Sequence, residues 1–390
     1  MYQYDFDAII DRNGTDCSKW DDIPYQVQAD DMLPMWTADM DFACPPAVMD
    51  AIRTRMEHPV FGYMKLPARY EESIILWHKK RYGSEIKKEE IIPVASVLGG
   101  VAMAIQGLTE KGDKILISTP GYHAFSNAVL NNERILVPSP MIKKEELYYM
   151  DFARMEKQIE EENIKLFLLC SPHNPTGRIW TQEELEILVE LCWRHRVYII
   201  SDEIHADMTL THPFLPVLKA GGDKAAEITI ALYAPTKTFN IAGLCTAYAV
   251  IKNQNLADRF KKALLASGLK LKNTLGVEAM IGGYLNGAQW VDELQRYLLD
   301  NASFAVEYIK ENIPVIQAYV PQATYFLWLD FAKTGLCQDE IIEKIVNEAH
   351  IAVTRGDDFI RGGDTCVRMV YACPRTRLAE ALTRLKKVFA

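Results

Sequence analysis

Three residues with the chemistry of a covalent cofactor site each follow a short apolar stretch of this 390-residue chain. In chain order they are Asn174 after residues 165–170, Asp202 after residues 197–200 and Lys237 after residues 228–233. Apolar runs of this length are typical of buried parallel strands, and parallel sheets bind ligands at the carboxyl ends of their strands. A lone loop lysine is usually just solvated. Three successive strand ends carrying these residues instead predict one shared site.

The amine of a lysine can form a Schiff base with an aldehyde cofactor. Pyridoxal phosphate is such a cofactor, and it needs a carboxylate beside its ring nitrogen to keep the ring cationic. Asp202 can supply this carboxylate, and the amide of Asn174 can donate to the oxygen on the ring. The neighbours Ala234 and Thr236 are small or hydroxylated, which suits close approach of a phosphate.

The order of three motifs resembles the class I and II aminotransferase family of fold type I pyridoxal phosphate enzymes. The motifs are Asn174-Pro175-Thr176-Gly177, Asp202-Glu203-Ile204-His205 and Thr236-Lys237-Thr238-Phe239-Asn240. The resemblance covers roughly residues 30–385, as ordinary domain lengths suggest. It implies an α/β fold, with a mostly parallel seven-stranded sheet in a large domain and a smaller α/β domain. We expect an N-terminal segment at 1–45, a large cofactor-binding domain at 46–285 and a small domain at 286–390.

Four segments are similar to one branch of the family, the MalY/PatB-type cystathionine β-lyases, which are carbon–sulfur lyases. The segments are residues 39–42, 61–63, 171–177 and 237–241. This resemblance implies β-elimination of L-cystathionine and related cysteine S-conjugates, or of cysteine or cystine, to pyruvate, ammonia and a thiol. Two alternatives stay open: an aminotransferase, and a regulator that keeps the fold and binds a protein partner.

The aspartates of residues 36–42 stand among apolar side chains. They could form a turn whose carboxylates cap backbone donors. In family terms the segment crosses the mouth of the active site, which makes Asp39 a candidate substrate-binding residue.

Residues 96–100, which precede a helical pattern running to about Leu108, are the candidate phosphate site, because free N–H groups at a helix start attract anions. We expect the amides of Val97 and Leu98 to bind the phosphate. The resemblance implies that Tyr122 stacks on the cofactor ring, and that Tyr63 reaches across a homodimer to the neighbour's phosphate. Many relatives bind the phosphate with an arginine at the position of Cys245, so this chain must use neutral donors.

Two further residues are candidates with open alternatives. His205 either orients the carboxylate of Asp202 or simply packs. Arg368 lies in an apolar strand-like run and needs an anion, because arginine is rarely buried unpaired. That anion is a structural carboxylate or, as in relatives, the α-carboxylate of the substrate. Arg375 is the competitor, and we expect it to begin the final helix in solvent.

The composition excludes other classes of protein. The net charge of −9 argues against a nucleic-acid binder. No run approaches the roughly 20 apolar residues of a membrane span. The polar, acidic start, residues 1–5, does not resemble a signal peptide, and the eight cysteines contain no Cys-x-x-Cys pair. We therefore expect a cytoplasmic enzyme without a metal site.

Strand-like and helical patterns alternate along the chain, which predicts right-handed βαβ units. We expect strands at 114–118, 135–138, 165–170, 197–201, 228–233, 246–251, 324–329 and 367–371. We expect helices at 46–57, 152–162, 255–310 with a break at Gly282-Gly283, 338–350 and from about 375. A further helix follows residues 96–100 and runs to about Leu108. Another begins at a capping box of Thr181 and Glu184 and ends near His195.

Overall fold

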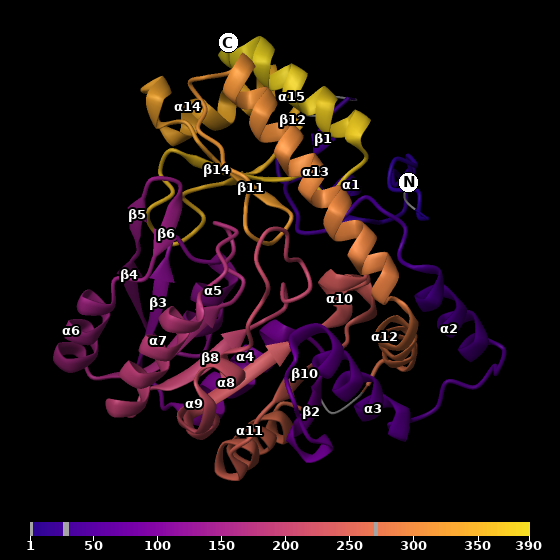
Figure 1. Ribbon diagram of the computed structural model, residues 1–390, viewed down its shortest axis with the longest axis vertical. Coiled ribbons are helices and arrows are strands. Elements are labelled where there is room, and N and C mark those ends of the chain that lie inside the picture. Colours follow the sequence, from indigo (N-terminus) through magenta and orange to yellow (C-terminus); the bar gives the residue numbers. More distant parts are fainter. Residues whose placement is uncertain (1–2, 26–30, 269–271) are drawn as a thin grey trace.

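A seven-stranded sheet forms the centre of the structure, a computed structural model that describes residues 3–25, 31–268 and 272–390 (Figure 1). The strand order is β2-β10-β9-β8-β7-β3-β4, and only β10 runs antiparallel to its neighbours. The strands are β2 (Ile91–Val94), β3 (Lys114–Thr119), β4 (Ile135–Pro140), β7 (Ile164–Cys170), β8 (Tyr198–Asp202), β9 (Thr229–Tyr233) and β10 (Ala247–Val250). The predicted mostly parallel seven-stranded sheet is confirmed.

Both faces of this sheet are buried, as its continuous apolar strands predict. In β7, Leu166 and Leu168 face one hydrophobic core and Phe167 and Leu169 face the other. The first core contains α4 (Val97–Leu108), α5 (His123–Asn131) and α11 (Gln254–Ala266). The second contains α2 (Pro46–Met56), α3 (Ala68–Trp77), α6 (Phe152–Glu162), α7 (Gln182–Arg194), α8 (Val217–Ala220), α9 (Gly222–Ile228) and α12 (Thr274–Asn286).

A smaller antiparallel sheet lies above the carboxyl ends of the central strands (Figure 1). It has the order β11-β14-β13, from β11 (Phe326–Asp330), β14 (Cys366–Val370) and β13 (Thr354–Arg355). The long helix α13 (Ala288–Asn312) and the last helix α15 (Arg375–Phe389) pack beside it. β1 (Leu33–Pro34) pairs in parallel with β12 (Ile351–Ala352), so the N-terminal segment joins the C-terminal part of the chain. The domain boundaries themselves stay a prediction.

The remaining described elements are short. They are α1 (Ser18–Asp21), a π-helical turn at His78–Tyr82, the hairpin β5 (Ile142–Lys144) and β6 (Leu147–Tyr149), α10 (Pro235–Thr238) and α14 (Gln338–Glu343) with its π-helical continuation to Glu348. Three 3-10 turns complete the set of described elements, at Lys88–Glu90, Ala242–Leu244 and Ala332–Thr334. The predicted capping box is confirmed, because Thr181 Oγ1 accepts from Glu184 N at 3.1 Å and Glu184 Oε2 accepts from Thr181 N at 2.8 Å.

The predicted helix break at Gly282-Gly283 is wrong. Both glycines lie inside α12, and that helix ends at Asn286. A Cβ on Gly282 would come 2.6 Å from the carbonyl oxygen of Ala47, so the glycine is there for close approach of α2 rather than for a turn. The predicted helical region at 255–310 is instead three helices, α11, α12 and α13, and its residues 269–271 lie outside the described residues.

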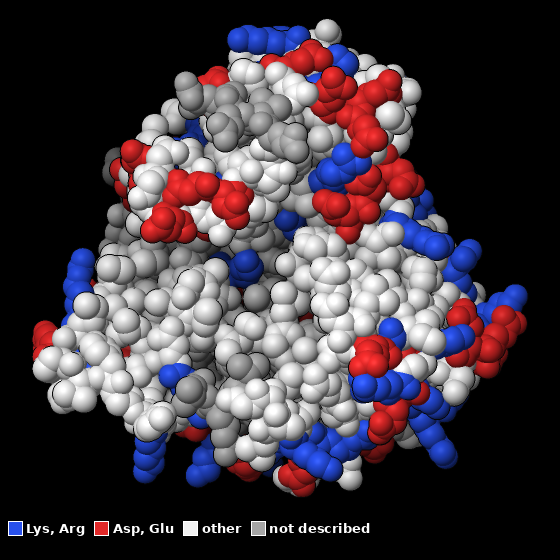
Figure 2. Space-filling model, turned by 180° about the vertical axis from the view of Figure 1, so that it is seen from behind, with Lys and Arg blue, Asp and Glu red and all other residues white. Residues whose placement is uncertain are grey.

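Figure 2 shows that the surface is hollowed between the part of the molecule around the small sheet and the part around the central sheet. Lys or Arg atoms are visible inside this hollow, and acidic side chains lie on the surface above it. Among the described residues, no helix has the length and apolar character that a membrane crossing requires. Residues 1–2, part of the segment that argues against a signal peptide, lie outside the described residues.

Candidate active site

A cavity of about 210 Å³ lies where β7, β8 and β9 end and α4 begins. Its lining brings together the predicted residues Val97, Leu98, Tyr122, Asn174, Asp202, His205, Thr236 and Lys237, with Ala38, Ala95, Ser96, Cys170, Ile204, Ala242 and Cys245. Ala234, although predicted for the site, is not in this lining and instead directly precedes α10. The ends of β7, β8 and β9 therefore meet at one cavity, as we expected from the sequence.

Lys237 sits in the short helix α10, which contacts on several sides hold in place. Its Nζ donates to the carbonyl of Ala38 at 2.6 Å. The next residue, Thr238, donates to the buried carboxylate of Asp207 at 2.8 Å, and Phe239 packs edge-on against Trp77. Burial lowers the pKa of Lys237 to about 8, although the charges of Asp39 and Asp202 act in the opposite direction. A lysine with this pKa is partly in its free-amine form near neutral pH.

Asp202 ends β8 and is buried. In the described part of the chain its carboxylate accepts one hydrogen bond, from Ile204 N at 3.0 Å, and no cation lies within ion-pair distance of it. Burial raises the pKa of Asp202 to about 7, and the Ile204 amide and Lys237 oppose this only in part. A buried carboxylate in this state is suited to a ligand that brings its own positive charge.

His205 does not orient Asp202 through any hydrogen bond seen among the described residues. Its ring packs edge-on against Tyr325 and Phe326, and its Nδ1 is buried without a hydrogen-bond partner. Burial lowers the pKa of His205 to about 3, so the ring is neutral. This geometry favours the packing alternative.

Arg368 is buried in β14, and no carboxylate of the described residues forms an ion pair with it. Its Nη1 donates to Asn174 Oδ1 at 3.0 Å and its Nη2 to the carbonyl of Trp36 at 3.0 Å, while Nε has no partner. The guanidinium carbon lies 4.4 Å from the ring centroid of Phe326, and burial lowers the pKa to about 10. The structural-carboxylate alternative therefore finds no support.

Arg375, the competitor of Arg368, does begin α15, as predicted. Its Nε donates to Asn301 Oδ1 at 2.6 Å, so the expectation that it is simply solvated is wrong. A half-buried arginine with this structural partner is a poor candidate for binding a substrate.

The candidate phosphate end of the cavity has only neutral donors. Ser96 caps α4, and its Oγ accepts from Gly99 N at 3.0 Å. The amides of Val97 and Leu98 have no acceptor within the helix, because the first turn of a helix leaves its N–H groups free. Thr236 and Cys245 line the same cavity, and the lining residues contain no arginine.

Tyr63 lies outside the cavity, with a side chain that is 96% exposed. Asp39 and Asp41 accept no hydrogen bond from a backbone N–H group of the described residues, so the capping alternative finds no support there. Arg12 Nη2 lies 2.7 Å from Asp39 Oδ2, and Arg12 Nη1 lies 2.9 Å from Asp41 Oδ1. The carboxylates pair with side-chain cations, and Asp41 also pairs with Lys19.

Two residues near the site have contacts that the sequence reasoning missed. Asn240 donates from Nδ2 to the carbonyls of Met40 and Phe42, each at 2.8 Å, and accepts from Met40 N at 3.1 Å. Its place three residues after Lys237 was the available signal. Arg12 is the second, and no local pattern in the sequence identifies its partners.

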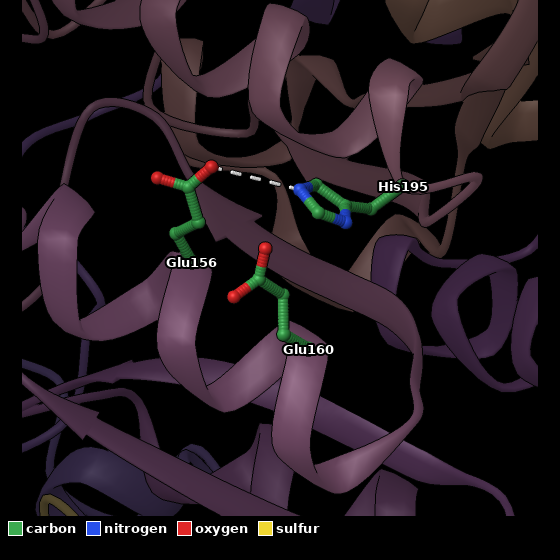
Figure 3. Close-up of side chains that lie close together, drawn as sticks. All are labelled: Glu156, Glu160 and His195. Carbon is green, nitrogen blue, oxygen red and sulfur yellow. Dashed lines mark ion pairs between the residues drawn. The ribbon is translucent and has the colours of Figure 1, made fainter.

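A separate cluster lies on α6 and at the end of α7, where Glu156, Glu160 and His195 approach one another (Figure 3). His195 Nε2 is 3.6 Å from Glu156 Oε1, the oxygen that also pairs with Arg194. Since this arginine already neutralises the carboxylate, we assign the cluster no metal.

The cavity fits pyridoxal phosphate by the chemistry of its side chains. It holds a lysine amine of lowered pKa, a buried carboxylate without a cation and free amides at a helix start. Lys237 would hold the aldehyde carbon, Asp202 the ring nitrogen, and Val97 and Leu98 the phosphate.

Comparison with known proteins gives matches along the whole chain. The model of the family "Aminotransferase class I and II" matches residues 30–385. The chain is 34% identical to cystathionine beta-lyase PatB of Bacillus subtilis (strain 168) and 33% identical to protein MalY of Escherichia coli (strain K12), each over 98% of both chains. The structure of a PLP-bound C-S lyase from Staphylococcus hominis superposes with a TM-score of 0.92 and 31% identity, covering 99% of this chain and 98% of that one.

These matches confirm the resemblance inferred from the motifs, including its MalY/PatB branch, and the fold type I architecture. The chain belongs to the class I and II aminotransferase family.

Proposed function

We propose that this protein is a pyridoxal phosphate-dependent carbon–sulfur β-lyase that acts on L-cystathionine and related cysteine S-conjugates. The observation that carries the proposal is the meeting of Lys237, Asp202 and Asn174 in one cavity. Arg368, which has no carboxylate partner among the described residues, donates a hydrogen bond to Asn174. Support also comes from the similarity to PatB, which is named a cystathionine beta-lyase.

Each side chain has a role that its surroundings permit. Arg368 binds the α-carboxylate of the substrate, because a buried guanidinium without an acidic partner favours an anion. Lys237, once its amine is free, removes the Cα proton, and its pKa of about 8 suits a general base near neutral pH. Bound pyridoxal phosphate supplies an electron sink for the carbon that loses this proton.

Three other residues support the role of the cofactor as electron acceptor: Asp202, Asn174 and Tyr122. Asp202 places a negative charge beside the ring nitrogen. Asn174 has Oδ1 occupied by Arg368, which leaves its Nδ2 to donate to the ring oxygen. Tyr122, next to β3, offers a ring face for stacking, worth about 1 kcal/mol beyond its buried area.

The reaction breaks the Cβ–S bond, and the electron pair leaves with sulfur, which takes a proton to become a thiol. Hydrolysis of the remaining three-carbon fragment consumes one water and gives pyruvate and ammonia. An aminotransferase, the alternative that the sequence left open, would instead transfer the amino group to a keto acid and release no thiol.

The deciding experiment incubates purified protein with L-cystathionine and no keto acid, and assays pyruvate and free thiol. We expect both in equal amounts, and neither with Lys237→Ala. Amino transfer that depends on added keto acid, without pyruvate release, would favour the aminotransferase instead. Borohydride reduction should tag one peptide, and a tag on a lysine other than Lys237 contradicts the site.

We further propose a homodimer in which Tyr63 of each chain completes the phosphate site of the other. Two observations support it: the 96% exposure of Tyr63, and a phosphate end without an arginine in the cavity lining.

The cytoplasmic location also stays a proposal. The eight free cysteines are consistent with a reducing compartment.

A further inference from the structure

The mouth segment, residues 36–42, contacts both cations of the site through its backbone. The carbonyl of Ala38 accepts from Lys237 Nζ at 2.6 Å, and the carbonyl of Trp36 accepts from Arg368 Nη2 at 3.0 Å. One short stretch of chain therefore contacts both the candidate base and the candidate carboxylate-binding group. Its position decides where these two side chains lie.

Other bonds fix these two carbonyls. Tyr325 donates to the Ala38 carbonyl at 3.2 Å, and Thr354 donates to the Trp36 carbonyl at 2.9 Å. Asn240 binds the far end of the segment through three hydrogen bonds. The middle of the segment, Asp39 to Asp41, is held by Lys19, whose Nζ donates to the Asp39 carbonyl at 2.8 Å and pairs with Asp41, and by a second side chain from outside the two sheets.

That side chain is Arg12. Its Nη1 donates to Asp39 Oδ1 at 3.1 Å, to the carbonyl of Met40 at 3.1 Å and to Asp41 Oδ1 at 2.9 Å. Its Nη2 donates to Asp39 Oδ2 at 2.7 Å and contacts Cys17 Sγ at 2.6 Å. A planar guanidinium has five donors in a fixed fork, which suits contact with three consecutive residues better than the three donors of a compact ammonium.

We propose that Arg12 is a positioning residue for Lys237. By fixing Asp39, Arg12 keeps the Ala38 carbonyl at the place where the free lysine amine rests, and it neutralises the Asp39 carboxylate, whose charge acts on that amine. The inference rests on the proposed role of Lys237 and adds a residue that acts on it through the mouth segment.

The charges around Lys237 make this role measurable. Asp39 faces it from the mouth segment, Arg368 from β14 and Asp202 from β8; Asp39 and Asp202 raise the pKa of Lys237 and Arg368 lowers it. Arg12 offsets the negative charge of Asp39. Removing Arg12 leaves that charge unopposed, so protonation at Nζ becomes easier. Removing the Asp39 charge has the opposite effect.

The test compares holoenzyme carrying Arg12→Met, Arg12→Lys, Asp39→Asn or the control Arg384→Met. Arg384 is a good match, because it also pairs with carboxylates and has 15% side-chain exposure against 18% for Arg12. The first readout is the pH midpoint of the cofactor's visible absorption, which reports protonation at Lys237 Nζ. The second is the separate determination of kcat and KM.

We expect Arg12→Met to raise the pH midpoint by about 0.5–1 unit and Asp39→Asn to lower it by a similar amount. Arg12→Met should lower kcat about 10- to 100-fold, because a misplaced base costs this much, and change KM less. Arg12→Lys keeps the charge and should keep the midpoint while lowering kcat. Arg384→Met should leave the midpoint and kcat as in wild type.

Equal effects of Arg12→Met and Arg384→Met on the midpoint and kcat would overturn the inference, and so would shifts of the same sign in Arg12→Met and Asp39→Asn. If Arg12→Met fails to fold, Arg12→Lys and Asp39→Asn still decide between the outcomes. Failure of the proposed function gives a different result, because the wild-type protein would then release no pyruvate from cystathionine or show no cofactor bound at Lys237.

Discussion

Two buried aspartates, Asp41 in the mouth segment and Asp202 in the cavity, have opposite surroundings. Asp41 is 2% exposed and Asp202 is 4% exposed. Asp41 has three cations within 3.2 Å, from Arg12, Lys19 and Arg377. Burial acts to raise its pKa, but Lys19 and the other donors bring the pKa below its usual value. Asp202 has no such cation among the described residues, and burial raises its pKa to about 7.

Two buried arginines repeat the contrast. Arg178 donates to both oxygens of Glu184, at 2.8 and 3.0 Å, whereas Arg368 has no acidic partner among the described residues. An isolated buried charge is costly, so an unpaired one persists where a ligand supplies the missing charge. Paired charges hold the fold together, and the unpaired charges mark the site. Four predictions test this distinction, from the largest expected effect to the smallest.

The first concerns the paired region, by which we mean Asp41 and the cations that surround it. Asp41→Asn leaves the buried ammonium of Lys19 without its carboxylate, and removing one partner of a buried pair costs about 3–5 kcal/mol. We expect the free energy of unfolding, measured with urea, to fall by this amount. The cofactor bound to the folded fraction of this variant should have the same visible absorption as in the wild type. A variant as stable as the wild type would show that these ion pairs add little.

The second concerns the open region, by which we mean the cavity around Asp202 and Arg368, whose charges have no ion-pair partner among the described residues. Asp202→Asn cannot hold a cationic ring, so we expect turnover to fall at least about 100-fold, comparable to other deletions of site electrostatics. Stability should not fall, because the substitution removes a buried carboxylate that has no cation. Kinetics and urea unfolding of the same preparation measure both. Near-normal turnover would make Asp202 a structural residue.

The third asks whether a second chain completes the open region. Losing one hydrogen bond to a charged phosphate costs roughly 1.5–3 kcal/mol, so Tyr63→Phe should bind pyridoxal phosphate about ten- to a hundredfold more weakly. Tyr308→Phe on α13 is the control and should bind it normally.

Subunit exchange sharpens this test. In a mixed dimer of Tyr63→Phe and Lys237→Ala chains, one site receives both defects and the other receives neither. Mixing at limiting cofactor should therefore restore activity. No recovery after exchange, or a fully active monomer, would show that Tyr63 does not act across an interface.

The two regions also differ in how far the sequence could predict them. The strand ends before Asn174, Asp202 and Lys237 were readable because each element is local and a parallel sheet aligns its carboxyl ends. The helix α3 was missed, although Tyr70, Ile74 and Trp77 have the spacing of a buried helical face. The glycines of α12 were taken for a break because a close helix contact and a turn use the same residue type.

The contacts around Arg12 could not be read from the sequence. They join residues 27 to 29 positions apart and, through Asn240, residues about 200 positions apart. No periodicity encodes such pairs, since each joins residues from separate parts of the chain. The turn interpretation treated Asp39 and Asp41 alike and the family resemblance singled out Asp39, but neither predicted that both would pair with Arg12.

The fourth prediction uses pH on cofactor-free protein. The folded-state pKa of Asp202, about 7, lies above its ordinary value of 3.8, so the folded protein binds the extra proton between these values. Its contribution to stability is present below about pH 4 and is lost as the pH rises to 7, by at most about 1.4 kcal/mol for each pH unit. Asp41 has a lowered pKa, so its contribution is present above its ordinary pKa of 3.8 and is lost as the pH falls below it.

Urea unfolding of wild type, Asp202→Asn and Asp41→Asn at several pH values between 3 and 8 measures these two differences. The free energy of unfolding of the wild type minus that of Asp202→Asn should decrease from pH 4 to 7. The same difference taken against Asp41→Asn should increase from pH 3 to 4 and then stay level. Glu203, whose pKa burial also raises to about 7, is present in all three proteins, so its direct contribution cancels in each difference. Bound pyridoxal phosphate should abolish the Asp202 slope, because a ring cation keeps the carboxylate ionised. Slopes of the same sign for both aspartates would mean that the paired and open regions do not differ in the way their contacts indicate.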